Sequence, residues 1–384
     1  MRAAVRATPR HRFVHRFRAN SDGPLHDLDA DPISLLPVVY HGQPLTHVAA
    51  DGTPLPSTNS EAAYVLWLVE RLGVEPTQQI LEIGSGSGWL LAVMAHLAGP
   101  EGAVTGIEII PSLADQSRAD LAELGRGNAR VLTADATCEP ISGAPFDRVI
   151  ITAATWSLPA AFFDLVAEGG KLLVPLRLPR DEGCEVTLLR RESCGFRAEW
   201  SFPGFFVPLV GASQSAEIAR VRIDEWTVQA GIDAEPSLSY PFWFASLAPS
   251  LPGTASPAFR RHLAMTEPGF TIFEPAAARP AAAKWLSDFG LLDGKAGSAA
   301  IMRAGRLIGY GAPTATRQLL ESYRRWCDLG MPGPTAYKLQ VIPTEATVSN
   351  ETAALTEVRG DSTFIRSIDA HAGAWCNLLE RTSS

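Results

Sequence analysis

A glycine-rich turn is the first feature of the sequence that could support chemistry. Gly84-Ser85-Gly86-Ser87-Gly88 follows an apolar, strand-like run at residues 79–83 and opens a helical pattern at residues 89–97. Glycine adopts positive φ easily and carries no side chain, so the turn can be tight and a ligand can come close to the backbone. We therefore expect a nucleotide-like ligand there, although strand-to-helix turns also contain glycines for purely steric reasons.

Acidic residues follow the next two predicted strands. The carboxylate of Glu108 can accept hydrogen bonds from both hydroxyls of a ribose bound where the order of a sheet reverses. Asp135 ends the third strand, where a carboxylate can accept from an adenine amino group. Glu82, just before the glycines, could orient an amino group of the cofactor, directly or through water. The arrangement predicts a site for an adenosine-containing cofactor formed by Glu82, Gly84, Ser85, Gly86, Gly88, Glu108, Asp135 and Ala136.

Two adenosine-containing cofactors fit this pattern. A dinucleotide-dependent oxidoreductase would share Glu108. Its usual fingerprint places a third glycine or alanine where this chain has Trp89, one position after Gly88. This departure favours S-adenosylmethionine over NAD, with a dehydrogenase kept as a distant alternative.

The elements that must position these residues alternate between strand and helix. Such alternation predicts a mainly parallel, doubly wound α/β sheet of the Rossmann-like type. Two later apolar runs, at residues 185–190 and 205–209, are expected to complete it as an antiparallel pair at one edge. The expected helices are residues 61–72, 89–97, 113–124 and 159–167, and the expected parallel strands are residues 79–83, 103–108, 129–132, 146–152 and 171–175.

The chain is long enough for a second domain, because 384 residues with 46% hydrophobic content exceed one typical core. Small and polar residues after Gly211 suggest a linker. We expect a methyltransferase domain at residues 1–211, a linker at 212–222, and an additional C-terminal α+β domain at 223–384. Within the last part, residues 275–283 are rich in alanine and proline, and helices are expected around residues 281–289 and 316–329.

Composition excludes several partners. A formal net charge of −8 argues against duplex nucleic acid, whose phosphates require a basic surface. No run approaches the roughly 20 apolar residues that cross a bilayer. The arginine-rich residues 2–18 lack the apolar stretch of a secretory signal, and their bland interpretation is a solvated helix face or chain end. Five scattered cysteines without a CxxC pair fit a reducing cytoplasm.

Metal sites are not expected. His11 and His15 have helical spacing but no third ligand in sequence. Residues 27–32 begin like a calcium loop, but Pro32 stands where the sharp turn needs glycine. His371 has no identifiable partner in sequence.

Several segments in order along the chain carry a family resemblance. The set resembles the protein-L-isoaspartate O-methyltransferase family and covers roughly residues 5–211. The resemblance implies methyl transfer from S-adenosylmethionine to a carboxylate of an aspartyl or isoaspartyl residue. The segments are Pro9-Arg10-His11-Arg12-Phe13-Val14, Pro56-Ser57-Thr58-Asn59-Ser60, residues 81–88, Phe146-Asp147, Gly169-Gly170-Lys171-Leu172-Leu173-Val174-Pro175 and Phe206-Val207-Pro208-Leu209.

The family's catalytic serine maps onto Ser57 by its distance from Tyr64. In that role its hydroxyl would hold the substrate carboxylate and align one oxygen with the methyl group. The family often has proline two residues later, where this chain has Asn59. A structural interpretation competes nearby, because Thr58 and Glu61 have the spacing of a capping box with Thr58 as N-cap. A carboxylate is already ionised at neutral pH, so we expect no general base.

The segments Leu319-Leu320-Glu321-Ser322-Tyr323-Arg324-Arg325-Trp326, Leu329-Gly330-Met331-Pro332-Gly333 and Tyr337-Lys338-Leu339-Gln340-Val341 are similar to family members from peptide-biosynthesis clusters of actinobacteria. That resemblance implies a macrocyclised ribosomal peptide, a graspetide or lanthipeptide precursor, as substrate. Its methylated aspartate would close to a succinimide (aspartimide), sometimes hydrolysed to isoaspartate. The alternatives are repair of isoaspartyl-containing proteins and a catalytically inactive peptide-binding protein. Core packing is expected for Tyr323 and Trp326.

Overall fold

The structure is a computed structural model. It describes residues 1–19, 22–181, 183–212, 219–242, 255–274, 288–303, 305–333, 336–346 and 353–368. Some expected features lie outside the described residues. They are residues 213–218 of the linker, the whole alanine- and proline-rich stretch at 275–283, and His371.

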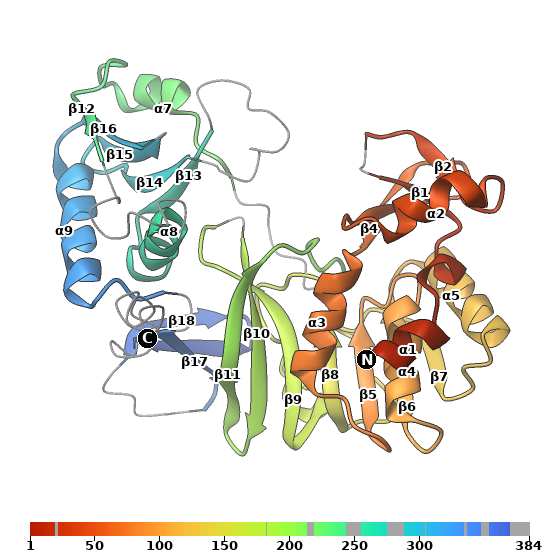
Figure 1. The fold of residues 1–384 in the computed structure, drawn as a ribbon. Coiled ribbons are helices and arrows are strands. Elements are labelled where there is room, and N and C mark those ends of the chain that lie inside the picture. Colours follow the sequence, from red (N-terminus) through yellow and green to blue (C-terminus); the bar gives the residue numbers. More distant parts are fainter. Residues whose placement is uncertain are drawn as a thin grey trace, which may run out of the picture.

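A ten-stranded sheet forms the centre of the molecule, with the order β18-β19-β17-β11-β10-β9-β8-β5-β6-β7 (Figure 1). The pairs β5–β6, β6–β7, β5–β8 and β8–β9 are parallel. The doubly wound α/β prediction is thus confirmed for this part of the sheet. Its strands are β5 (Gln79–Ile83), β6 (Ala103–Glu108), β7 (Ala129–Thr133), β8 (Phe146–Ile151) and β9 (Val166–Arg177).

Buried side chains cover both faces of these strands. Neighbouring residues of a strand point to opposite faces, so Ile80 joins one apolar cluster and Leu81 the other. The first cluster includes buried residues of α3, α4 and α5, and the second includes the phenylalanines of α6. The covering helices are α3 (Ala62–Leu72), α4 (Trp89–Ala98), α5 (Pro111–Glu123) and α6 (Ala161–Leu165).

The antiparallel pair that follows differs from the prediction. It consists of β10 (Cys184–Glu192) and β11 (Gly195–Gly204), whereas residues 205–209 contribute only an isolated bridge between Pro208 and Ala154. The pair is not at the edge either, because β11 also bonds to β17 through Phe196 and Arg197. The strand at residues 205–209 was therefore a wrong prediction.

The later part of the chain contributes to two sheets. A separate five-stranded sheet has the order β12-β16-β15-β14-β13, and three further strands extend the central sheet. Trp326 is fully buried and Tyr323 packs against the same cluster, which confirms core packing for both. The described part of the helix expected at 281–289 is strand instead, since β14 begins at Asp288. The elements are α7 (Ile223–Ala230), β12 (Leu238–Pro241), α8 (Ala255–Thr266), β13 (Phe270–Phe273), β14 (Asp288–Asp293), β15 (Ser298–Arg303), β16 (Arg306–Gly311), α9 (Thr314–Asp328), β17 (Tyr337–Pro343), β18 (Ala353–Arg359) and β19 (Ser362–Ile368).

The four strands and one helix between residues 16 and 59 form a small unit above the end of the central sheet at which the glycine turn lies, whereas the first helix of the chain, at residues 2–7, packs against α4 (Figure 1). A four-stranded sheet with the order β2-β1-β3-β4 delivers residues 57–60 to the start of α3. Among the described residues, no helix combines the length and apolar character needed to cross a membrane. The elements are α1 (Arg2–Ala7), η1 (Arg10–Phe13), β1 (Arg16–Arg18), β2 (Leu25–Asp27), α2 (Pro32–Tyr40), β3 (Leu45–Val48) and β4 (Pro54–Asn59).

Candidate functional site

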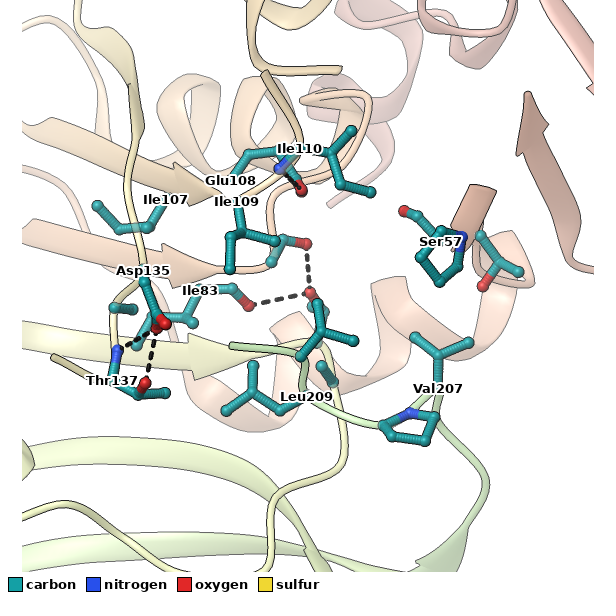
Figure 2. Close-up of a pocket in the computed structure, with 18 of the residues that line it drawn as sticks. Ser57, Ile83, Ile107, Glu108, Ile109, Ile110, Asp135, Thr137, Val207 and Leu209 are labelled. Carbon is teal, nitrogen blue, oxygen red and sulfur yellow. Dashed lines mark hydrogen bonds between the residues drawn. The ribbon is translucent and has the colours of Figure 1, made fainter. Parts of the chain in front are cut away.

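A cavity opens where β5, β6, β7 and β8 end, the place at which open α/β sheets bind ligands. Its empty volume is about 660 Å³, including the part open to solvent. Figure 2 labels residues at or just after the ends of β5, β6 and β7 around it, together with Val207 and Leu209 on another side. The lining residues are Pro56, Ser57, Thr58, Ser60, Ile83, Gly84, Ile107, Glu108, Ile109, Ile110, Ala134, Asp135, Ala136, Thr137, Thr152, Ala153, Val207, Pro208, Leu209 and Val210.

The glycine turn and Glu108 form one hydrogen-bonded unit. Gly84, Gly86 and Gly88 have φ of 83°, 52° and 81°, so the positive-φ requirement inferred from sequence is met at all three. The backbone N–H of Gly86 donates to Glu108 Oε2 at 2.8 Å, and the N–H of Ile110 donates to Oε1 at 2.9 Å. Burial raises the pKa of Glu108, and these N–H donors oppose the rise. Each oxygen keeps a lone pair with which it can accept a ligand hydroxyl.

Asp135 is fixed on the other side of the cavity. Its Oδ1 accepts from the N–H and the hydroxyl of Thr137 at 2.9 and 2.6 Å (Figure 2), and Oδ2 accepts from the N–H of Ala212 at 2.7 Å. Burial favours a higher pKa, but these hydrogen bonds outweigh it and hold the pKa of Asp135 below its usual value. The carboxylate thus faces the cavity ionised, next to the buried Ala136.

A second hollow of about 360 Å³ adjoins the first and contains the predicted residues Glu82 and Ser85. Three buried polar atoms in its wall, Glu82 Oε2, Asn59 Nδ2 and Ser85 Oγ, have no hydrogen-bond partner within the described part of the chain. Burial, and then the nearby Glu108, raise the pKa of Glu82 well above its usual value. An unpaired buried carboxyl beside unpaired donors suits a ligand that carries both an ammonium and a carboxylate group.

Ser57, the catalytic candidate by family resemblance, lies in β4 and lines the main cavity. A Cβ placed on Gly86 would be 3.9 Å from Ser57 Oγ, so the hydroxyl stands directly over the glycine turn. Ser60, which the sequence did not single out, lines both hollows. Its position immediately before a predicted helix was the available signal.

The capping box was wrong. Thr58 belongs to β4, and Glu61 is itself the N-cap of α3, accepting from the N–H groups of Ala63 at 2.9 Å and Tyr64 at 2.6 Å. Strand pairing with β3 holds Thr58 extended, which removes it from the helix start. The side chain that caps α3 is therefore Glu61, and the predicted N-cap Thr58 does not have this role.

The interpretation of the arginine-rich N-terminal segment as a solvated face is wrong for Arg10. This arginine is 1% exposed, stacks over the ring of Trp89, and donates to the carbonyls of Asn59 and Ser60 at 3.2 and 2.8 Å. Burial lowers the pKa of its guanidinium. Arg10 thus fixes the backbone that carries the two candidate serines.

The histidines considered for a metal have separate partners. His11 Nδ1 bonds to the hydroxyl of Tyr40 at 2.9 Å, whereas His15 bridges Asp29 and Asp120. In the calcium-like segment, Asp31 accepts from Ser34 N–H and caps α2. Gly88, which was also predicted to contact the cofactor, lies at the start of α4 and packs against Ser117.

Comparison with known proteins agrees with this geometry. The model of the family described as protein-L-isoaspartate(D-aspartate) O-methyltransferase matches residues 35–214. The chain is 36% identical over 171 residues to the protein-L-isoaspartate O-methyltransferase of Ignicoccus hospitalis, covering 43% of this chain and 80% of that protein. It is also 36% identical over 170 residues to the enzyme of that name from Gloeobacter violaceus, covering 43% and 81%.

Two solved structures are similar to the chain. One, described as a protein-L-isoaspartate O-methyltransferase, has a TM-score of 0.47 and 18% identity, and covers 79% of this chain and 84% of its own. The other is a putative protein-L-isoaspartate O-methyltransferase from Plasmodium falciparum in complex with S-adenosyl-L-homocysteine. It has a TM-score of 0.42 and 20% identity, and covers 54% of this chain and 88% of its own.

Proposed function

The chain belongs to the protein-L-isoaspartate O-methyltransferase family, and from this premise we propose that it esterifies an aspartyl or isoaspartyl carboxylate presented at the junction of the two hollows. As a family member it is an S-adenosylmethionine-dependent carboxyl methyltransferase with a Rossmann-like class I sheet. The observation that carries the proposal is the position of two serines: Ser57 lines the main cavity beside Gly86, and Ser60 lines both hollows.

The residues around the hollows fit S-adenosylmethionine. Glu108 would hold the ribose hydroxyls and Asp135 the adenine amino group, with Gly84, Gly86 and Ala136 in the adjoining walls and Gly88 turning the chain into α4. In the second hollow, Glu82 would attract the amino group, while Ser85 and Asn59 offer donors to a carboxylate. When bound, the cofactor supplies an electrophilic sulfonium methyl group.

The chain's own residues then have mainly to orient the substrate. A carboxylate is ionised at neutral pH, so no proton needs to be removed before it attacks. A serine hydroxyl that donates to one carboxylate oxygen leaves the other directed at the methyl group, and this positioning lowers the entropic part of the barrier. Ser57 is the candidate by family resemblance, and Ser60 is a second candidate because it borders both hollows.

Matched alanine variants distinguish the two serines. Loss of turnover in Ser57→Ala, with S-adenosylhomocysteine binding retained, would support Ser57, and the same result for Ser60→Ala would transfer the role to Ser60. Ser34→Ala, on the exposed side of α2, serves as the control. Unchanged turnover in both variants would remove the serines from the mechanism.

The substrate proposed in finer detail is an aspartate of a macrocyclised ribosomal peptide in the cytoplasm. This rests on the resemblance of residues 319–341 to peptide-modifying members and on the 170 residues after the family match, numbered 215–384. We assign recognition of the cyclised peptide to the part after residue 222. The methyl ester is a better acyl electrophile than the carboxylate; attack by the following backbone nitrogen would form a succinimide and release methanol.

Repair of damaged proteins is the second candidate, and the names of the curated relatives favour it. A repair enzyme would accept many isoaspartyl sequences, whereas a dedicated peptide enzyme would accept one. The third interpretation, an inactive peptide-binding protein, predicts damage to the cofactor site. Gly84, Gly86, Gly88, Glu108 and Asp135 are all present.

Mass spectrometry with two substrates separates these functions. The protein is incubated with S-adenosylmethionine and either a cyclised precursor peptide encoded beside its gene or a generic isoaspartyl peptide. Methyl gain followed by net loss of one water from the cyclised peptide alone would support dedicated succinimide formation. Methylation of the generic peptide would support repair, and transfer to neither would reject both.

A further inference from the structure

The turn between β18 and β19 is bonded to one short segment of the central domain. The guanidinium of Arg359 donates to the carbonyl of Trp156 at 3.1 Å and lies 4.0 Å from the centroid of its ring. The carboxylate of Asp361 accepts from the N–H of Ala160 at 3.2 Å. Side chains at the tip of one hairpin thus fix both ends of residues 156–160.

The middle of that segment is held as well. The hydroxyl of Ser362 accepts from the N–H of Leu158 at 3.0 Å and donates to the carbonyl of the same residue. Ser362 and Leu158 are fully buried, and Arg359 is 1% exposed. Hydrogen bonds made by fully buried groups are costly to break, because the freed partners do not reach water.

The held segment continues directly into the wall of the cofactor cavity. Thr152 and Ala153 line the cavity, and the Thr152 hydroxyl donates to the carbonyl of Gly84 at 2.7 Å. Ala154 donates to the carbonyl of Val207 at 2.7 Å and accepts from the N–H of Leu209 at 2.8 Å. Two walls of the cavity are therefore connected through residues 152–155 to the segment that the hairpin holds.

We infer that residues 359–362, at the tip of the β18–β19 hairpin, are positioning residues that hold the cofactor cavity in its binding shape. The hairpin lies outside the family match, which ends at residue 214. It nevertheless contacts Trp156, which is three residues from Ala153 in the cavity lining. The part of the chain beyond the matched region thus contributes to the cofactor site itself. This inference concerns the cofactor site alone and does not depend on which peptide is methylated.

The test measures binding of S-adenosylhomocysteine to the full-length protein by isothermal titration calorimetry. The test variant is the double substitution Asp361→Ala and Ser362→Ala, which removes three hydrogen bonds to residues 158–160. Val358→Ala is the matched control, because this side chain is 62% exposed in the same hairpin. Asp361→Asn keeps a carbonyl oxygen able to accept from Ala160 N–H and serves as the conservative rescue.

We expect the double variant to bind the ligand about tenfold more weakly than the control, while the rescue variant binds like the wild type. A purely structural role would lower the melting temperature but leave the affinity of the folded protein unchanged. Affinity within twofold of the control would overturn the inference. If the double variant shows no cooperative melting, the single Asp361→Ala variant replaces it. We expect this variant to bind the ligand about threefold more weakly than the control. Unchanged affinity would again overturn the inference.

Discussion

Substituting Glu108 by glutamine tests how the cofactor site is organised. The carboxylate is 4% exposed and accepts two backbone hydrogen bonds, from Gly86 at 2.8 Å and from Ile110 at 2.9 Å. Glutamine offers one carbonyl oxygen, and its amide NH₂ must face one of the two N–H donors. The variant therefore loses at least one charge-assisted hydrogen bond and places two donors in opposition.

Hydrogen bonds to charged groups contribute about 1.5–3 kcal/mol. Together with the weaker acceptor left for a ribose hydroxyl, we expect a loss of about 2–3 kcal/mol in binding free energy, or about 30- to 150-fold in affinity. Calorimetric titration with S-adenosylhomocysteine measures this change, with Glu70→Gln on the exposed face of α3 as the control. A Glu108→Gln protein that melts like the wild type and binds within threefold of the control would refute the role of Glu108.

Three further predictions concern stability and pH. Gly88→Ala should lower the free energy of unfolding by about 3 kcal/mol, since its Cβ would lie 2.0 Å from Ser117 Oγ. Urea unfolding should show a loss of about 1 kcal/mol for the control Gly73→Ala, where only the left-handed backbone (φ 69°, ψ 60°) is strained. Hydrogen bonding to Asp120 raises the pKa of His15 to about 9. The wild type should therefore be about 1 kcal/mol more stable than His15→Gln below pH 6.5, and this difference should be lost as the pH rises through 9. Equal pH profiles of the unfolding free energy for the two proteins would contradict this. Burial raises the pKa of Glu82, so binding of the cationic cofactor should release a proton from this carboxyl group and should strengthen as the pH rises. Calorimetry in buffers of different ionisation enthalpy measures the released proton. The Glu82→Gln variant should show neither the proton release nor the pH dependence.

The parallel core of the sheet was predictable because its signals are local. β5 and β6 were predicted with the bounds that the structure has, since each is a short apolar run followed by a turn or an acidic residue. The glycine turn, Glu108 and Asp135 then met at one edge because parallel strands end on the same side. The sequence thus predicted correctly that these residues lie together at one edge of the sheet.

The antiparallel strands were harder to predict. β11 contains Pro203, which weakens its strand signal, because proline cannot donate a hydrogen bond to a neighbouring strand. The apolar residues 205–209 looked more like a strand, but they run along the cavity wall and bond to Ala154. Only Leu209 of this segment is buried and Phe205 is 58% exposed, so apolar character did not mark a strand here.

Contacts between distant segments account for the remaining errors. Arg10 is buried against carbonyls 49 and 50 residues away, and Arg359 donates to a carbonyl 203 residues away. No periodicity or spacing connects such positions in a single sequence. The role of Ser60 at the junction of two hollows likewise became visible only with both walls in place.

The most direct test of the central claim is whether the chain forms a carboxyl methyl ester. The protein is incubated with S-adenosylmethionine labelled in the methyl group and with an isoaspartyl peptide or the cyclised precursor. Methyl esters hydrolyse in mild base, so we predict label that is released as volatile methanol by base and is strongly reduced with Glu108→Gln at limiting cofactor. Base-stable label, or no transfer to any carboxylate-bearing peptide, would contradict the assignment.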